Sequence, residues 1–135
     1  MISTKLKTIF ALSIPLFIAH GIEEILTGFY QVDAWDQALF APLASLSVHG
    51  AMFVTFQFML WLLLAVGLLM LQSERMRLYV LGVAGVVYLF ELHHIVKAIL
   101  AGGYYPGLIT ALLFPPLAYL FWKEWVRNYQ LLKKA

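Results

Sequence analysis

Hydrophobic positions in this chain form long continuous runs, unlike the one-faced helices and alternating strands of soluble domains. Four runs, at approximately 8–29, 46–72, 78–100 and 108–126, each provide the roughly 20 mostly apolar residues that a transmembrane helix needs. Short polar or glycine- and proline-containing segments separate them. The pattern predicts an all-α fold: an integral membrane four-helix antiparallel bundle, formed by one domain over residues 1–135.

The composition also favours a membrane location. Of the 135 residues, 63% are hydrophobic and 12% are charged, and the mean hydropathy is +0.87. Soluble domains contain about 45–50% apolar and about 25% charged residues, and so short a chain could not bury this excess from water. A net charge of +2 does not indicate nucleic-acid binding. The expected partners are membrane lipids, and the sequence is also compatible with a homo-oligomer.

Lysine and arginine residues are distributed asymmetrically along the chain. They precede the first run (Lys5, Lys7), occupy the second connection (Arg75, Arg77) and follow the last run, while the first and third connections contain none. Because cytoplasmic loops are enriched in these residues, both termini are predicted to be cytoplasmic. The protein is expected to be a multi-pass protein of the cell inner membrane.

Several ionisable residues lie inside the predicted spans. A charged side chain near the bilayer centre costs roughly 2.5–3.5 kcal/mol on insertion scales, so such groups must be paired, protonated, metal-bound or exposed to a wet cavity. The residues concerned are His20, Glu23 and Glu24 in the first span, His49 in the second, and Glu91, His93 and His94 in the third.

These residues are predicted to share one depth. Counted at 1.5 Å per residue from the outer helix ends, they lie roughly 5–14 Å below the outer boundary. Within each span, i, i+3 and i+4 spacings direct most of them to one helix face, whereas His93 is rotated towards another neighbour. The sequence therefore predicts one buried site in the outer half of the membrane, formed by His20, Glu23, Glu24, His49, Glu91 and His94.

A transition-metal site is the first functional interpretation of this set. Imidazole and carboxylate groups one helical turn apart are the ligands of di-iron and di-manganese helical bundles. The same six residues could hold one or two ions of iron, zinc or manganese, and the absence of cysteine excludes thiolate ligands. The metal could then act on a lipophilic small-molecule substrate.

Two alternatives remain open. Burial can bring a Glu/His pair near neutrality as proton donor and acceptor, so Glu23, Glu24 and Glu91 could serve as catalytic groups of a metal-free isomerase or cyclase of a sterol- or isoprenoid-like lipid. The polar groups could instead only fasten the helices together, in a non-catalytic structural or lipid-binding protein. Whether the protein is an enzyme is left open at this stage.

The motif His20-Gly21-Ile22-Glu23-Glu24 resembles the signature of the HXXEE-domain proteins, a family of small bacterial multi-span membrane proteins. The stretches 91–94 and 105–111 are similar to that family's second recognisable block. The resemblance extends over nearly the whole chain and implies a small membrane protein without indicating a reaction. A looser likeness is to the four-span sterol isomerases related to emopamil-binding protein, which also carry intramembrane His and Glu.

Overall fold

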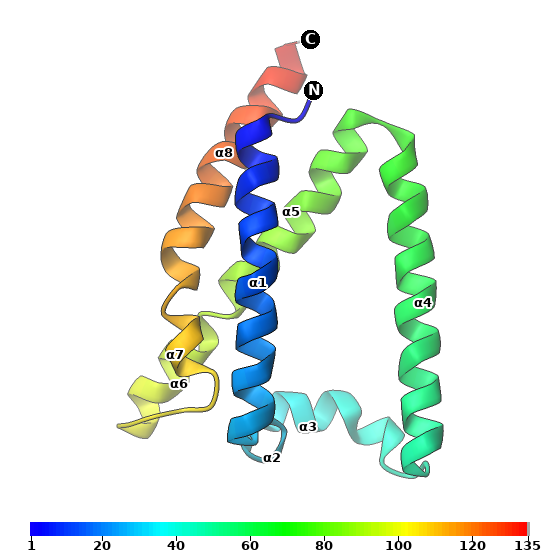
Figure 1. The fold of residues 1–135 in the computed structure, drawn as a ribbon, viewed down its shortest axis with the longest axis vertical. Helices are drawn as coiled ribbons and strands as arrows, with labels where there is room; N and C mark the ends of the chain where they lie inside the picture. The colour runs from blue at the N-terminus through cyan, green and yellow to red at the C-terminus, as the bar shows by residue number, and fades with distance from the viewer. Residues whose placement is uncertain (135) are drawn as a thin grey trace.

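A computed structural model describes residues 1–134, and every regular element in this range is helical (Figure 1). The elements are α1 (Thr4–Thr27), α2 (Phe29–Val32), α3 (Ala34–Phe40), a 3₁₀ turn (Ala41–Leu43), α4 (Val48–Gln72), α5 (Glu74–Phe90), α6 (His93–Ala101), α7 (Leu108–Ala111) and α8 (Phe114–Lys134). The all-α prediction is therefore confirmed for the described residues.

Local capping determines where the long helices begin and end. Ser3, Ser47 and Ser73 precede α1, α4 and α5, and each side-chain oxygen accepts a hydrogen bond from a backbone N–H in the first turn. These bonds satisfy donors that have no partner within the helix. Gly28 ends α1 in the left-handed conformation, at a φ of 71°, and donates its N–H back to α1 carbonyls.

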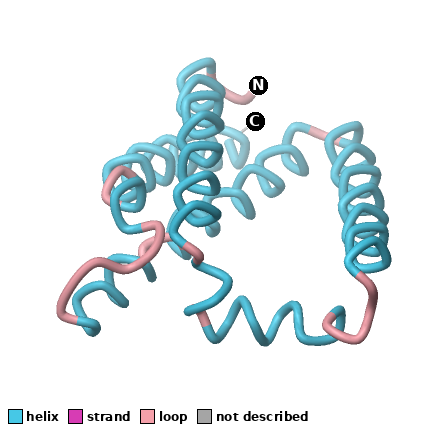
Figure 2. Tube along the Cα trace, turned by 60° about the horizontal axis from the view of Figure 1, so that its bottom comes forward, coloured by secondary structure: helices cyan, strands magenta, loops and turns pink. Residues whose placement is uncertain are grey.

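Helices α1, α5 and α8 pack against one another and enclose the core (Figures 1 and 2). Gly82 and Gly85 allow α8 to approach α5 closely, because a Cβ at Gly85 would collide with the Phe121 ring. The indole N–H of Trp122 donates to the Gly85 carbonyl, and that of Trp125 donates to the Leu78 carbonyl. The largest fully buried apolar side chains are Tyr88, Phe114, Phe121, Leu6 and Leu78.

Helix α4 stands apart from this three-helix core (Figure 1). It packs mainly against α5, and none of the described side chains in its most apolar stretch is buried. Because α4 is apolar on all sides, no single face is distinguished for packing against protein. The structure does not confirm a four-helix bundle: three segments pack together, and α4 extends beside them.

Within residues 1–134, three helical segments are long and apolar enough to cross a membrane: Thr4–Thr27, Val48–Gln72 and Glu74–Ala101. They indicate a membrane protein. The fourth predicted span, 108–126, falls on α7, a turn and the start of α8, where Lys123 and Glu124 enter the helix. Both chain ends lie at the same end of the molecule (Figure 1). Four membrane passes and a cytoplasmic location for both termini stay predictions.

Candidate metal centre

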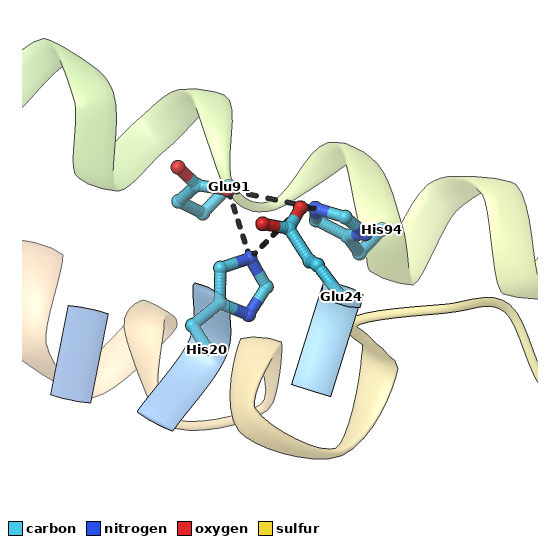
Figure 3. A group of neighbouring side chains, drawn as sticks. All are labelled: His20, Glu24, Glu91 and His94. Carbon is cyan, nitrogen blue, oxygen red and sulfur yellow. Dashed lines mark hydrogen bonds and ion pairs between the residues drawn. The ribbon is translucent and has the colours of Figure 1, made fainter. Parts of the chain in front are cut away.

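Four side chains from three segments meet at one point, and we call this group the His/Glu centre (Figure 3). His20 and Glu24 come from α1, Glu91 from the turn between α5 and α6, and His94 from α6. One ligand atom from each residue lies within 4.8 Å of the other three. His20 and His94 are buried, with 2% and 0% of their surface exposed.

A local irregularity in the third apolar segment positions Glu91 and His94. Between Phe90 and His93 the helix tightens, because Leu92, His94 and Ile95 donate to carbonyls only three residues earlier. Such 3₁₀ turns inside long helices often mark functional positions. Glu91 and His94 emerge from this turn side by side, and they face His20 and Glu24, which are one turn apart on α1.

The proton on the His94 ring can be assigned from its neighbours. Nδ1 lies 2.6 Å from the carbonyl oxygen of Pro106, which can only accept, so Nδ1 carries the hydrogen. Nε2 is buried and makes no hydrogen bond with the described residues, although Glu24 Oε1 and Glu91 Oε2 lie 3.2 and 3.5 Å away. In the neutral ring a lone pair therefore faces two electron-rich oxygens, and the arrangement requires a cation between them, either a proton or a metal ion.

His20 is held in the same tautomer by Thr110. Its Nδ1 lies 2.7 Å from the Thr110 hydroxyl oxygen. The single proton of that hydroxyl is directed to acceptors, the Glu23 carboxylate and the Gly107 carbonyl, so the oxygen accepts from His20 Nδ1–H. Nε2 of His20 then faces Glu91 Oε2 at 3.1 Å and Glu24 Oε1 at 3.7 Å.

Glu23 lies outside the His/Glu centre and supports it indirectly, through residues that contact the centre. Its carboxylate accepts hydrogen bonds from the backbone N–H groups of Ile109 and Thr110, at 2.9 and 2.8 Å, and from the Thr110 hydroxyl. It also accepts from the Tyr104 hydroxyl at 3.0 Å. The adjacent acids of the His-x-x-Glu-Glu motif therefore have different positions: Glu24 joins the centre, and Glu23 ties α1 to α7.

Gly107 brings the loop backbone against both imidazole rings. Its φ is +83°, in the left-handed region that favours glycine. A Cβ at this position would lie 2.7 Å from Nδ1 and Cε1 of His94 and 3.0 Å from Cε1 of His20. The loop can contact the rings this closely only because residue 107 has no side chain.

The spacing of the centre is compatible with a metal ion, because its four ligand atoms all lie within 4.8 Å of one another. The four Nε2-to-carboxylate distances are 3.1, 3.2, 3.5 and 3.7 Å. Ligand atoms around a tetrahedral ion at about 2.1 Å are separated by about 3.4 Å. Two imidazoles and two carboxylates suit iron, zinc and manganese. The Nδ1–H groups that bind Pro106 and Thr110 are the outer contacts that usually orient metal-ligating histidines.

The structure does not bring every predicted residue to the centre. His49 lies exposed near the start of α4, which stands away from α1. His93 faces elsewhere, as its rotation predicts: its Nδ1 bonds the Phe90 carbonyl, and its Nε2 lies 4.0 Å from Asp33.

Asp33 forms a second buried polar cluster, which was not predicted from the sequence. Its carboxylate is 1% exposed, forms an ion pair with Lys97 and accepts a hydrogen bond from the Tyr105 hydroxyl at 2.8 Å. It also accepts from the backbone N–H groups of Trp35 and Asp36. Burial alone would raise the pKa of Asp33, but the hydrogen bonds from Lys97, Asp36 and Tyr105 outweigh it and lower the pKa from 3.8 to about 2. Burial and the bond to Asp33 raise the pKa of Tyr105 to about 12.

Two further residues of the site, Thr110 and Gly107, were also missed as functional positions. Both lie in the stretch 105–111, whose resemblance to a family block was noted without a role for any residue. The available signal was a threonine three residues after a Pro-Gly pair at the start of an apolar run.

A cavity of about 330 Å³ adjoins the His/Glu centre and is lined in part by Glu24 and Glu91. Its remaining wall includes Phe29 from α2, Trp35 from α3 and Phe90 from the end of α5. The centre therefore borders a space of the size that small ligands occupy.

Together these features define an all-helical protein with the character of a membrane protein and a buried group of histidines and carboxylates that could hold a metal ion. The chain belongs to the family described as a protein of unknown function with HXXEE motif, whose model matches residues 11–121. The HXXEE assignment made from the motif is thus confirmed. No curated protein and no solved structure matches the chain, so the looser likeness to sterol isomerases gains no support.

Proposed function

We propose that the His/Glu centre binds a single transition-metal ion and that the protein uses this ion in chemistry on a lipophilic substrate within the membrane. His20 and His94 provide Nε2, and Glu24 and Glu91 provide one carboxylate oxygen each. The observation that carries the proposal is the buried Nε2 of His94, which makes no hydrogen bond with residues 1–134 and faces two carboxylates.

One ion is favoured over two by the position of the remaining candidate ligands. The four ligand atoms converge on one point. The carboxylate of Glu23 is occupied by four donors from Tyr104, Ile109 and Thr110, and His49 lies on α4. A second ion would therefore lack ligands among the residues predicted for it.

The cavity beside Glu24 and Glu91 favours a chemical role over a purely structural one. A bound ion would supply Lewis acidity or redox chemistry at the wall of that cavity. The chain's own residues hold both imidazoles in one tautomer and keep the two rings buried, and the two carboxylates would neutralise a bound divalent ion. Because Glu24 and Glu91 also line the cavity, an ion held by them would lie beside a substrate bound there.

Elemental analysis of the purified protein tests whether the centre binds a metal ion. The protein is purified in mild detergent without chelator and without a histidine tag, so that neither removes nor adds metal. We expect about one equivalent of iron, zinc or manganese, in the ratio that four ligands around one ion require. Glu91→Gln and His94→Ala variants should lose the metal. His49→Ala is the matched control and should retain it, because His49 is exposed on α4.

The competing role is metal-free acid/base chemistry, in which a proton rather than a metal lies between His94 Nε2 and the carboxylates. The same cavity would serve that role. Protein that stays free of metal after incubation with iron, zinc and manganese salts would refute the proposed metal binding and favour metal-free acid/base chemistry.

A further inference from the structure

The charges around the cavity beside the centre are unequally compensated. Glu24 and Glu91 face the two imidazole rings, and Asp33 forms an ion pair with Lys97. Asp36 also lines the cavity, but its carboxylate forms no ion pair and accepts no hydrogen bond from residues 1–134. Even with a divalent cation neutralising Glu24 and Glu91, the cavity keeps one negative charge at Asp36.

Three aromatic residues share the lining of this cavity with Asp36. Phe29, Trp35 and Phe90 contribute to the same wall. A carboxylate combined with aromatic faces is suited to a positively charged nitrogen, because the ring faces and the carboxylate both attract a cation. An anionic headgroup would be repelled by Asp36.

An apolar surface continues from the cavity along α3. Trp35 and Leu39 line the cavity and are also 77% and 70% exposed. Helix α3 follows α2 and leads through the 3₁₀ turn to α4, at the end of the molecule opposite the termini (Figure 1). A ligand with its polar head in the cavity could therefore extend an alkyl chain across Trp35 and Leu39 towards lipid.

We propose that this cavity binds the ammonium headgroup of a long-chain amine, with Asp36 as its counter-ion and Phe29, Trp35 and Phe90 around it. The inference rests on the proposed function in that it gives the substrate class of the same site: the head of the amine lies beside Glu24 and Glu91. Asp36 acts on the ligand directly, and its carboxylate is not needed for the metal.

The indole signals of the tryptophans provide a direct test of binding. The chain contains four tryptophans, so its ¹H–¹⁵N spectrum in detergent should show four indole signals, and Trp35→Phe identifies the one from Trp35. The protein is titrated with n-octylammonium, n-octanol and n-octanoate in the same micelles. Octylammonium should shift the Trp35 signal saturably, and the other two should not.

Two variants that each remove one negative charge distinguish binding in the cavity from nonspecific attraction of the ammonium ion to the protein. Asp36→Asn should weaken apparent octylammonium binding about tenfold or more, as expected for the loss of a charged partner. Glu74→Gln is the matched control and should leave binding unchanged, because Glu74 begins α5 at the opposite end of the molecule. Equal binding of octanol, or unchanged binding in Asp36→Asn, would overturn the proposal.

Metal content measured on the same samples keeps the two proposals apart. Saturable octylammonium binding by protein that contains no metal would support the proposed ammonium site and count against the proposed metal binding. One full equivalent of metal, without a shift of the Trp35 indole signal that depends on Asp36, would support the proposed metal binding and refute the ammonium site. Asp36→Asn should keep the wild-type metal content and helical circular dichroism, which excludes misfolding as the cause of lost binding.

Discussion

His20 and His94 lie edge to face, with ring centroids 4.7 Å apart and an angle of 87° between the ring planes. Each ring directs Nδ1 to an outer acceptor and Nε2 to the same pair of carboxylates. Two residues 74 positions apart are thereby held in matching tautomers. This relationship leaves Nε2 of each ring facing the carboxylates, which is the arrangement that metal-ligating histidines have when an outer contact orients Nδ1–H.

The neighbouring acids Glu23 and Glu24 should differ in their effect on metal binding. Glu24→Gln replaces a proposed carboxylate ligand by a neutral amide, which is a much weaker ligand, so we expect metal to be absent from the purified variant. Glu23→Gln alters only the contact to Thr110, which in turn holds His20. Changes to residues that orient a metal ligand without binding the metal typically weaken metal affinity about 10–100-fold. Titration against a competing chelator measures both affinities. Equal losses in the two variants would contradict the different positions assigned to these acids.

Gly107→Ala should disturb both histidines. A methyl group at residue 107 would meet the two rings, and a non-glycine residue at this positive φ costs about 1–2 kcal/mol. We expect the unfolding free energy to fall by about 2 kcal/mol or more and metal affinity to fall with it. The matched control is Gly103→Ala in the same loop, where no atom lies within 4 Å of the added Cβ and φ is not positive. Thermal unfolding in detergent compares the two, and similar losses would argue against close packing at Gly107.

Asp33 should make folding stability depend on pH in the acidic range. Its pKa in the folded protein is about 2, below the ordinary value of 3.8. Its stabilising contribution is therefore complete above about pH 4 and is lost as the pH falls towards 2. At neutral pH, Asp33→Asn should lower the unfolding free energy by about 3 kcal/mol, because it leaves Lys97 without its partner.

Unfolding curves of wild type and Asp33→Asn test this assignment together. The difference between them should narrow from pH 4 to pH 2, since the wild-type carboxyl then becomes neutral as well. Asp36→Asn should show a much smaller loss at neutral pH, because Asp36 has no ion-pair partner in the part of the chain that the structure describes. A difference that stays constant down to pH 2 would mean that the Asp33–Lys97 pair does not stabilise the fold.

The orientation in the membrane can be tested with single cysteines, because the chain contains none. Lys7→Cys and Lys133→Cys lie at the end of the molecule where both termini meet, and Gly103→Cys lies in the loop after α6. The distribution of Lys and Arg predicts that a membrane-impermeant thiol reagent added to intact cells labels only Gly103→Cys. Labelling of the two terminal positions alone would reverse the predicted orientation.

The residues of the centre could be found in the sequence because polar groups are conspicuous in apolar runs. His20, Glu24, Glu91 and His94 were identified by depth and helical spacing, which depend only on position along a regular helix. The same criteria could not separate Glu24 from Glu23. Both lie on the side of α1 that faces the other helices, and the position of α7 decides which carboxylate turns to Thr110.

The predicted depth in the membrane was also not sufficient to decide whether His49 belongs to the centre. It shares the predicted layer with His20, but α4 lies apart from α1 (Figure 1). Thr110, Gly107 and the Pro106 carbonyl could not be assigned from spacing, because the loop that carries them folds back against α1 only in the tertiary structure. Asp33 likewise meets Lys97 across 64 residues of chain.

By itself, the sequence determined the helical character and the membrane-suited length of the apolar segments, and it predicted six site residues that include the four of the centre. These features follow from local properties: hydrophobicity, capping residues and the 3.6-residue period of the helix. Only the tertiary structure decided which carboxylate joins the centre, which ring nitrogen is free and where the adjoining cavity lies. Those outcomes depend on contacts between segments distant in the chain, and helical periodicity does not specify how such segments approach one another.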